Sequence, residues 1–219
     1  MSTQNLKQQL FEQFARVGKA ISSPVRLDLL ECLGQGQRNV EALAEKCGIP
    51  VSNASHHLQQ LRQAGLVSAS KDGLYVYYRL AGDEVIGLLS ALRSVAEQNN
   101  AEVERLINTY LTVKDTMEPV LAEELLDRVR KGLVTVLDVR PPDEYAAGHI
   151  AGAVNVPLAE LEKYLRKLKP KKEIVAYCRG PHCVLSYDAV EKLRARGIKA
   201  RRLKQGFPEW KAAGLPVEV

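Results

Sequence analysis

Cysteines are few in this sequence, and long hydrophobic runs are absent. Four of the 219 residues are cysteine, too few for a fold held together by disulfides, and such usage is typical of a reducing cytoplasm. No apolar run approaches the roughly 20 residues of a membrane-spanning helix, and the polar residues 1–10 do not read as a signal peptide. We therefore expect a cytoplasmic protein with no membrane partner.

The charge is modestly basic and unevenly distributed. The chain carries 31 Lys and Arg against 26 Asp and Glu, and 46% of its residues are hydrophobic, which excludes global disorder. An excess of basic residues suggests a nucleic-acid partner. However, residues 1–110 contain eleven basic and eleven acidic residues, so the whole excess lies in the second half. Motifs, rather than total charge, must identify any DNA-binding face.

The hydrophobic pattern of the sequence changes near residue 115. Residues 84–110 have the apolar spacing of one long helix, and residues 111–119 lose it and end in Glu118-Pro119, which predicts a linker. Beyond it, apolar strand-like runs alternate with helical stretches, at residues 133–139, 174–177 and 200–203 for strands and 120–130, 158–168 and 184–196 for helices. This alternation predicts a parallel α/β sheet. We expect two domains, a mainly α domain over residues 1–112 and an α/β domain over residues 119–219.

The first domain has the helix pattern of a helix-turn-helix. A helix is predicted over residues 5–17, and Ser23-Pro24 begins a second helix that stops at Gly34. Two short helices follow, over residues 40–46 and 53–63, for which Asn39 and Ser52 are the expected N-caps. Two such helices across a Gly-containing turn are the layout of a helix-turn-helix.

The second of these short helices has a polar outer surface. Ala54, Leu58 and Leu61 form its predicted buried stripe. The residues that face outward are Ser52, Asn53, Ser55, His56, Gln59, Gln60 and Arg62. Short polar side chains near a helix N-terminus suit hydrogen bonding to base edges in a major groove. An ordinary solvated helix face explains this helix alone equally well.

A predicted hairpin follows directly. Residues 66–70 and 74–80 read as strands around Lys71-Asp72-Gly73, with Lys71 at the tip, where a phosphate or minor groove would lie. The stretch SSPVRLDLLECLGQGQRNVEALAEKCGIPVSNASHHLQQLRQAGLVSASKDGLYVYYRL resembles the ArsR/SmtB-type winged-helix repressors. The resemblance implies a homodimer formed by the first and last helices, and two recognition helices that read a palindromic operator in double-stranded DNA.

The metal motifs of that family are missing. Residues 39–44 lack its paired cysteines, and residues 84–110 contain neither His nor Cys. His56, His57, Cys32 and Cys47 do not have the spacing of a tetrahedral zinc site. We expect no metal and no cofactor, with Cys32 and Cys47 as small buried side chains.

The second domain places a cysteine at the end of a strand. The apolar residues 173–177 run into Cys178, followed by a loop and then a helical pattern. The loop consists of Arg179, Gly180, Pro181, His182 and Cys183. Loop amides above a helix N-terminus favour an anion, so a thiolate or persulfide at Cys178 is expected there. Such a thiolate suits nucleophilic sulfur transfer.

The surrounding motifs carry a second resemblance. The stretches VLDVRPPDEYAAGHIAGAVNVPL, IVAYCRG and LKQGFPEWKAAGLPVE are similar to those of rhodanese domains. The resemblance implies that Cys178 is the catalytic, sulfur-carrying nucleophile and that residues 179–183 form the active-site loop. It also implies a small sulfur donor: thiosulfate, a persulfide or a polysulfide. Asp138 and Arg140 would belong to a structural network, and Gly206 and Trp210 to C-terminal packing.

Several roles in this loop stay open. Val184 stands where phosphatases and arsenate reductases of this fold carry an Arg, which disfavours phosphate or arsenate turnover. Cys183 either resolves a Cys178 persulfide or only begins the next helix. His182 either bonds a substrate or fills the rim, and Arg179 could attract an anionic donor.

The combined interpretation is a transcriptional repressor whose operator affinity responds to reactive sulfur species through Cys178. Two alternatives remain. One is a sulfurtransferase that uses the winged helix only to dimerise, and the other is an arsenite-responsive repressor that uses Cys178 and Cys183.

Overall fold

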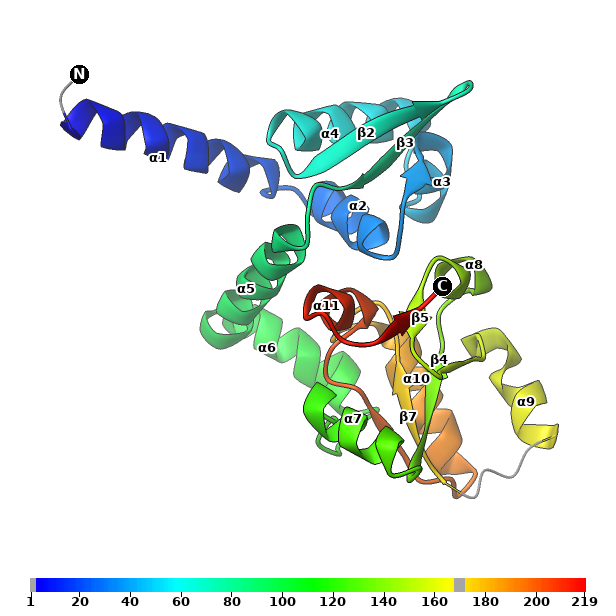
Figure 1. The fold of residues 1–219 in the computed structure, drawn as a ribbon. Coiled ribbons are helices and arrows are strands. Elements are labelled where there is room, and N and C mark those ends of the chain that lie inside the picture. Colours follow the sequence, from blue (N-terminus) through cyan, green and yellow to red (C-terminus); the bar gives the residue numbers. More distant parts are fainter. Residues whose placement is uncertain (1–2, 168–171) are drawn as a thin grey trace. The chain divides into compact units, whose positions relative to one another are not determined.

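The structure is a computed structural model that describes residues 3–167 and 172–219 (Figure 1). The chain divides into two compact units, Met1–Val85 and Ile86–Val219. Among the described residues, no helix is both long and apolar enough to cross a membrane.

The first unit is a helix-turn-helix with a hairpin. In chain order its elements are α1 (Thr3–Ala20), α2 (Pro24–Gly34), β1 (Arg38–Asn39), α3 (Val40–Lys46), α4 (Val51–Gln63), β2 (Val67–Asp72) and β3 (Tyr75–Leu80). The strands form an antiparallel sheet in the order β1-β3-β2. The predicted start of α2 at Pro24 is confirmed, and Asn39 caps α3 by accepting a hydrogen bond from the Ala42 amide at 2.9 Å. The predicted stripe of Ala54, Leu58 and Leu61 is fully buried.

Two local predictions in this unit are wrong. Pro50, not Ser52, is the N-cap of α4, because extended backbone at Pro50 leaves its carbonyl free to accept the first helical hydrogen bond, from the Ala54 amide. The hairpin is also longer than predicted, since Asp72 pairs with Tyr75 and leaves Gly73 and Leu74 as the turn. Gly73 has a φ of 58°, the left-handed conformation that glycine adopts without strain. Lys71 therefore lies within β2 and not at the tip.

The second unit begins within α5 (Glu84–Asn99), from Ile86 onward. Its helical elements are α6 (Ala101–Ile107), the π-helix η1 (Asn108–Thr112), α7 (Ala122–Arg130), α8 (Pro142–Ala146), the 3-10 helix η2 (Leu158–Glu160), α9 (Leu161–Lys167), α10 (Val184–Ala195) and α11 (Phe207–Ala212). Its strands are β4 (Val134–Asp138), β5 (His149–Ile150), β6 (Val154–Asn155), β7 (Glu173–Tyr177), β8 (Ala200–Arg202) and β9 (Val217–Glu218).

The single long helix predicted over residues 84–110 is interrupted. Asn100 leaves the helical conformation, and its side chain accepts a hydrogen bond from the Glu102 amide at 3.0 Å to cap α6. Asn competes for backbone amides in this way, which explains the break despite a continuous apolar pattern. The segment predicted as a linker contains two buried side chains, Leu111 and Asp115.

The core of the second unit is a parallel sheet in the order β6-β4-β7-β8. The predicted strands and helices are present, but α7 begins at Ala122, because Val120 instead forms a parallel β-bridge with Leu203, and Leu168 lies outside the described residues. Side chains of β7 alternate between two hydrophobic clusters: Ile174 and Ala176 pack with α9 and α10, whereas Val175 and Tyr177 pack with α7 and α11. Helices thus cover both faces, as parallel sheets require (Figure 1).

Candidate functional site

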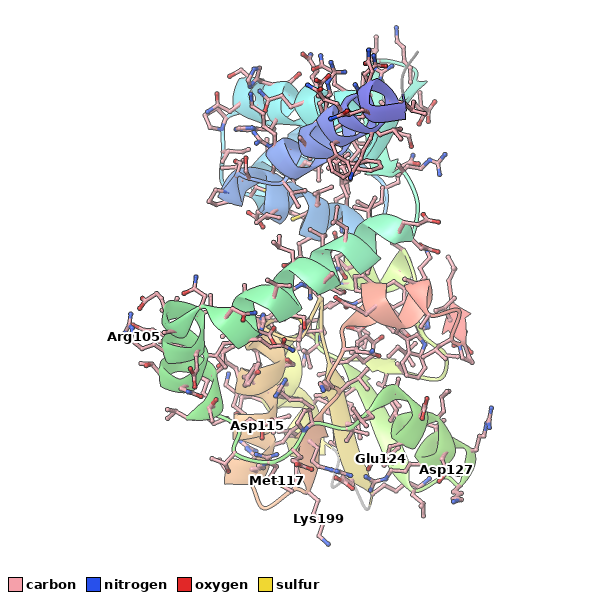
Figure 2. The ribbon with its side chains drawn as sticks, turned by 90° about the vertical axis from the view of Figure 1, so that its left-hand side faces the viewer. Arg105, Asp115, Met117, Glu124, Asp127 and Lys199 are labelled. Carbon is pink, nitrogen blue, oxygen red and sulfur yellow. A yellow bond between two sulfur atoms is a disulfide. The ribbon has the colours of Figure 1, made fainter. Side chains whose placement is uncertain are left out.

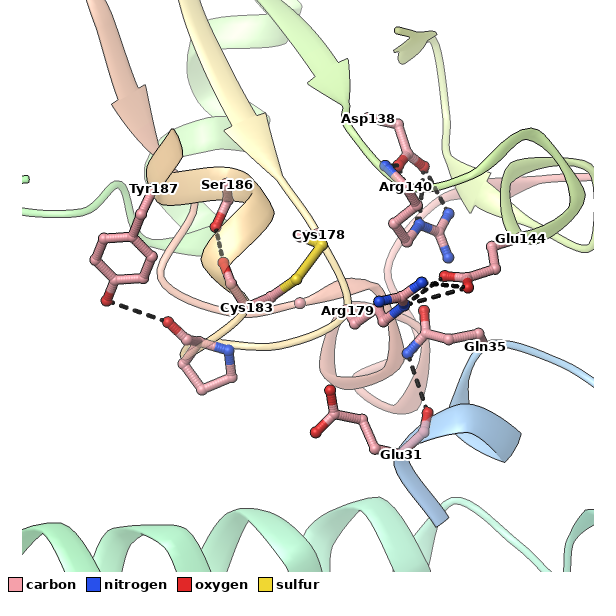
Figure 3. The surroundings of a disulfide bond; sticks show 12 residues. Glu31, Gln35, Asp138, Arg140, Glu144, Cys178, Arg179, Cys183, Ser186 and Tyr187 are labelled. Carbon is pink, nitrogen blue, oxygen red and sulfur yellow. Dashed lines mark hydrogen bonds and ion pairs between the residues drawn. A yellow bond between two sulfur atoms is a disulfide. The ribbon is translucent and has the colours of Figure 1, made fainter. Parts of the chain in front are cut away.

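Cys178 stands directly after β7, at the carboxyl edge of the sheet. This edge is where open α/β sheets place their sites. Only 1% of its surface is exposed. Its sulfur forms a disulfide with Cys183, and the two Cα atoms are 6.1 Å apart (Figure 3). Cys183 is the N-cap residue of α10, so the sulfur bridge closes the loop from the strand end to the helix start.

Hydrogen bonds to α10 hold this loop. The hydroxyl of Ser186 donates to the Cys183 carbonyl at 2.9 Å, and that of Tyr187 donates to the Pro181 carbonyl at 3.3 Å (Figure 3). The Cys183 amide donates to the Gly180 carbonyl. The loop that carries both sulfurs is therefore tied to the first turn of the helix behind it.

The side chain of Arg179 points toward the carboxylate of Glu144. Its Nε and Nη2 bond the buried Glu144 carboxylate at 2.9 and 2.8 Å (Figure 3). Two parallel bonds of this kind fix the guanidinium firmly. Much of the positive charge that could attract an anionic donor is thus offset by Glu144.

His182 contacts helix α5. Its Nε2 lies 3.1 Å from the Glu97 carboxylate. Burial lowers the pKa of His182, while Glu97 acts in the opposite direction. Next to it, Arg93 pairs with Glu209 of α11 at 2.8 Å. A Cβ on Gly180 would lie 3.4 Å from Arg93 Nη1, so the loop also packs closely against Arg93.

A buried charged network lies beside the same sheet edge. Asp138 and Arg140 are fully buried and joined at 2.6 Å, and Arg140 also donates to the Gly148 carbonyl at 2.8 Å. The Tyr177 hydroxyl donates to Asp138 at 2.5 Å. Burial, reinforced by Asp138, raises the pKa of Tyr177, so this hydroxyl remains a donor. These residues make contacts that suit a structural role.

The C-terminal motif supports the loop from another side. The Phe207 amide donates to the Cys178 carbonyl at 3.0 Å, and Trp210 Nε1 donates to the Pro216 carbonyl at 2.8 Å. Gly206 lies so close to the loop that a Cβ there would be 2.3 Å from the Arg179 carbonyl oxygen.

Sequence reasoning missed Asp115. Figure 2 labels Asp115. The buried carboxylate of Asp115 bonds Arg194 and Arg202, each at 2.7 Å. Arg202 in turn lies 3.6 Å from the ring centre of Tyr187, which bonds the loop. The partners are 79 and 87 residues away from Asp115, so no local pattern signals the contact.

The candidate DNA-binding face lies on α4. Ser52, Asn53, His56, Gln59, Arg62 and Lys71 are exposed, and Ser55 is half-buried. A groove between α4 and the hairpin brings Ser55, Gln59 and Arg62 together with Val76 of β3. Gln60 is turned toward α2 instead, since its Oε1 accepts from Arg26 at 2.7 Å.

Two further thiols, Cys32 and Cys47, meet in the first unit. Their sulfurs are 3.7 Å apart, and the oxygen of Asp28 lies within 4.8 Å of both. The hydrogen bond with Cys32, together with burial, raises the pKa of Cys47. Both are half-buried, rather than the small buried side chains that the sequence led us to expect.

Two domain families match separate parts of the chain. A helix-turn-helix domain family matches residues 21–68, and the rhodanese-like domain family matches residues 121–213. The HTH-type transcriptional regulator Rv0324 of Mycobacterium tuberculosis is 44% identical over 97% of this chain and 93% of its own length.

Single-domain relatives match each half. The thiosulfate sulfurtransferase GlpE of Coxiella burnetii is 33% identical over 41% of this chain and 82% of its own length. A solved homodimeric winged helix-turn-helix domain of a possible ArsR-family regulator from Mycobacterium bovis is 41% identical. It covers 46% of this chain and 91% of its own, with a TM-score of 0.42.

Proposed function

This chain belongs to the ArsR-type winged-helix transcriptional regulators that carry a C-terminal rhodanese domain, and from that premise we propose that it is a repressor controlled by sulfur chemistry at Cys178. Persulfidation of Cys178 in the cytoplasm, followed by disulfide formation with Cys183, would lower its affinity for operator DNA. The observation that carries the proposal is the pairing of these two sulfurs in one loop that contacts α5.

The DNA-bound form is proposed to be a homodimer. Exposed apolar side chains follow one another along α1, at Leu6, Leu10, Phe11 and Phe14, of which Phe14 is 63% exposed. Such a stripe on a separate helix is typical of a surface that another chain covers. Two copies would present two α4 helices to the two halves of a palindromic site. The proposed contacts on α4 are Ser52, Asn53, Ser55, His56, Gln59 and Arg62, and Lys71 of β2 is the proposed phosphate contact.

The sulfur step begins with a reduced loop. The Cys178 thiolate attacks the sulfane sulfur of thiosulfate, forms a sulfur–sulfur bond and releases sulfite, which takes the bonding electron pair. A persulfide or polysulfide donor would release a thiolate or a shorter polysulfide instead. The product is a persulfide on Cys178.

Cys183 completes the reaction. Its thiolate attacks the Cys178 Sγ of the protonated persulfide and displaces hydrosulfide, which leaves the Cys178–Cys183 disulfide. Two thiols are oxidised and the sulfane sulfur is reduced, so no outside oxidant is needed. The Cα separation of 6.1 Å lies within the range that disulfides allow.

The contacts of α5 provide the proposed route to DNA binding. Glu97 and Arg93 both contact the loop region, through His182 and Gly180 respectively. By resemblance, this helix helps to form the dimer. A change of loop conformation on oxidation would therefore alter α5. In the proposed dimer, this would change the spacing of the two α4 helices that contact DNA.

The test measures operator affinity by fluorescence anisotropy with DNA from the upstream region of the gene. Treatment of the reduced full-length protein with polysulfide should weaken binding about tenfold or more, within the range of allosteric couplings. Cys178→Ser should not respond, and Cys183→Ser should accumulate a persulfide that mass spectrometry detects. A Cys32→Ser/Cys47→Ser protein is the matched control and should respond as the unmodified chain does. A full response in Cys178→Ser contradicts the proposal.

A second candidate is a sulfurtransferase in which the winged helix only dimerises the chain. The resemblance to the thiosulfate sulfurtransferase GlpE favours it. It predicts steady turnover of thiosulfate with no specific DNA binding at moderate salt. Release of DNA by arsenite but not by polysulfide would instead favour an arsenite-responsive repressor.

A further inference from the structure

The winged-helix unit contains three side chains with metal-ligating atoms that the proposed DNA contacts and sulfur chemistry do not use. Asp28 and Cys32 lie four residues apart on α2, so they share one helix face. Cys47 is the C-cap residue of α3. The carboxylate oxygen and the two sulfurs all lie within 4.8 Å of one another.

The spacing of the sulfurs matches a shared ion. Metal–sulfur bonds of about 2.3 Å in a tetrahedral site place two sulfurs about 3.8 Å apart. Cys32 and Cys47 hold theirs at 3.7 Å, in thiols that are not joined by a disulfide. Two ligands are therefore at the required separation, and the Asp28 oxygen, within 4.8 Å of both sulfurs, is the candidate third ligand.

The ligand types narrow the choice of ion. Thiolates and a carboxylate suit Zn²⁺ or Cd²⁺, whereas Mg²⁺ and Ca²⁺ require oxygen ligands. Asp28 is exposed and both thiols are half-buried, so solvent reaches the cluster and can supply a fourth ligand.

We propose that Asp28, Cys32 and Cys47 form a binding site for a thiophilic divalent ion such as Zn²⁺ or Cd²⁺, with the fourth position open to water. On binding, the thiol protons pass to solvent and no redox change occurs. This ion site does not involve Cys178. A negative result for ion binding would therefore not affect the proposed repressor function, and the reverse also holds.

Binding would have a mechanical consequence. Cys47 precedes the turn through Gly48 and Pro50 that leads into α4. An ion held by α2 and by the end of α3 would tie this turn to α2. We therefore expect added ion to raise the Tm of the winged-helix unit, because it binds the folded form only.

The test uses the full-length Cys178→Ser/Cys183→Ser protein, in which Cys32 and Cys47 are the remaining cysteines of the four. Titration with Cd²⁺ should produce a thiolate-to-cadmium absorption band that saturates at one equivalent per chain. Further replacement Cys47→Ser should remove the band, and Asp28→Asn should weaken affinity about tenfold or more. Glu45→Gln, which removes an exposed carboxylate of α3 outside the cluster, is the matched control and should bind normally.

A second measurement avoids the variants altogether. In the unmodified chain, Cd²⁺ should protect Cys32 and Cys47 from alkylation by iodoacetamide, as read by mass spectrometry of each peptide. Equal alkylation rates with and without Cd²⁺ would overturn the proposal. It would also be overturned if no band formed at one equivalent, or if Asp28→Asn bound Cd²⁺ as tightly as its parent.

Discussion

Gly206 faces the backbone of Arg179 so closely that no side chain fits between them. A Cβ at Gly206 would lie 2.3 Å from the Arg179 carbonyl oxygen and 2.4 Å from the Gly180 nitrogen. These are backbone atoms of the loop that carries Cys178 and Cys183, so they cannot swing away as a flexible side chain could. The absence of a side chain at Gly206 thereby determines where the loop lies.

Gly206→Ala should therefore displace the loop. We expect a loss of about 1–3 kcal/mol in stability, as for other overpacked sites. Sulfur transfer to Cys178 should slow about tenfold or more, because the nucleophile is misplaced. Denaturant unfolding followed by the fluorescence of Trp210, the single Trp, measures the first effect, and a thiosulfate assay measures the second. Gly87→Ala on α5, where a Cβ meets nothing within 4 Å, is the control and should lose neither stability nor activity.

The buried Asp138 carboxylate depends on two partners that a substitution can remove separately. Arg140→Ala leaves a fully buried negative charge without its ion pair and should cost about 3–5 kcal/mol. Tyr177→Phe removes only a hydroxyl that donates to Asp138 and accepts from the Ile150 amide, and should cost about 1–3 kcal/mol. Unfolding monitored at Trp210 checks both. Equal costs for the two variants would contradict this ranking.

The contrast between local and distant contacts explains what the sequence could predict. The apolar run Ile174–Tyr177, followed by Cys178 and a helical pattern, predicted the strand, loop and helix of the candidate site, because each depends on neighbouring residues. The pairing of Asp115 with Arg202 could not be predicted, since these residues are 87 positions apart and meet only after the sheet has formed.

The same limit applied to the winged helix. The buried face of α4 followed from its period, but the orientation of Gln60 depends on Arg26, which lies 34 residues earlier. Likewise, Cys32 lies on α2 and Cys47 caps the end of α3, and the two show no ligand spacing along the chain. The break at Asn100 was missed for another reason: a capping side chain prevailed over a continuous apolar pattern.

His182 should make the second unit sensitive to acid. Its pKa is lowered mainly by burial, with Arg93 and Arg202 acting in the same direction and Glu97 and Glu209 opposing them. The unfolded chain therefore binds this proton at a higher pH than the folded one. Stability should fall as the pH drops below about 6.5, the ordinary pKa of His.

His182→Gln should remove this part of the pH dependence. The measurement is the urea midpoint reported by Trp210 between neutral and mildly acidic pH. The variant should lose less stability than the unmodified chain over that window. His57, whose pKa is also lowered, remains in both proteins and cancels in the comparison. Parallel curves for the two proteins would count against the prediction.

Gln59 and Lys71 should affect DNA binding in different ways. Gln59 lines the groove beside Ser55 and Arg62, and a Gln side chain can bond an adenine edge with two hydrogen bonds. Gln59→Ala should therefore relax specificity at one base pair of each half-site, by about 1–3 kcal/mol. Lys71→Ala should weaken binding to all sequences alike and reduce the salt slope by about 1 per half-site. Competition with operator variants at several salt concentrations separates the two effects.

Arg93 should transmit the state of the loop without taking part in sulfur chemistry. It pairs with Glu209 at 2.8 Å and packs against Gly180. Arg93→Ala should leave persulfide formation at Cys178 intact, as read by mass spectrometry. The effect of polysulfide on operator affinity should shrink by about 2-fold or more, the smallest change that coupling residues contribute. Arg105→Ala on α6, which removes an exposed pair with Glu102, is the matched control and should keep the full response. If Arg93→Ala also kept it, α5 would not carry the signal through this side chain.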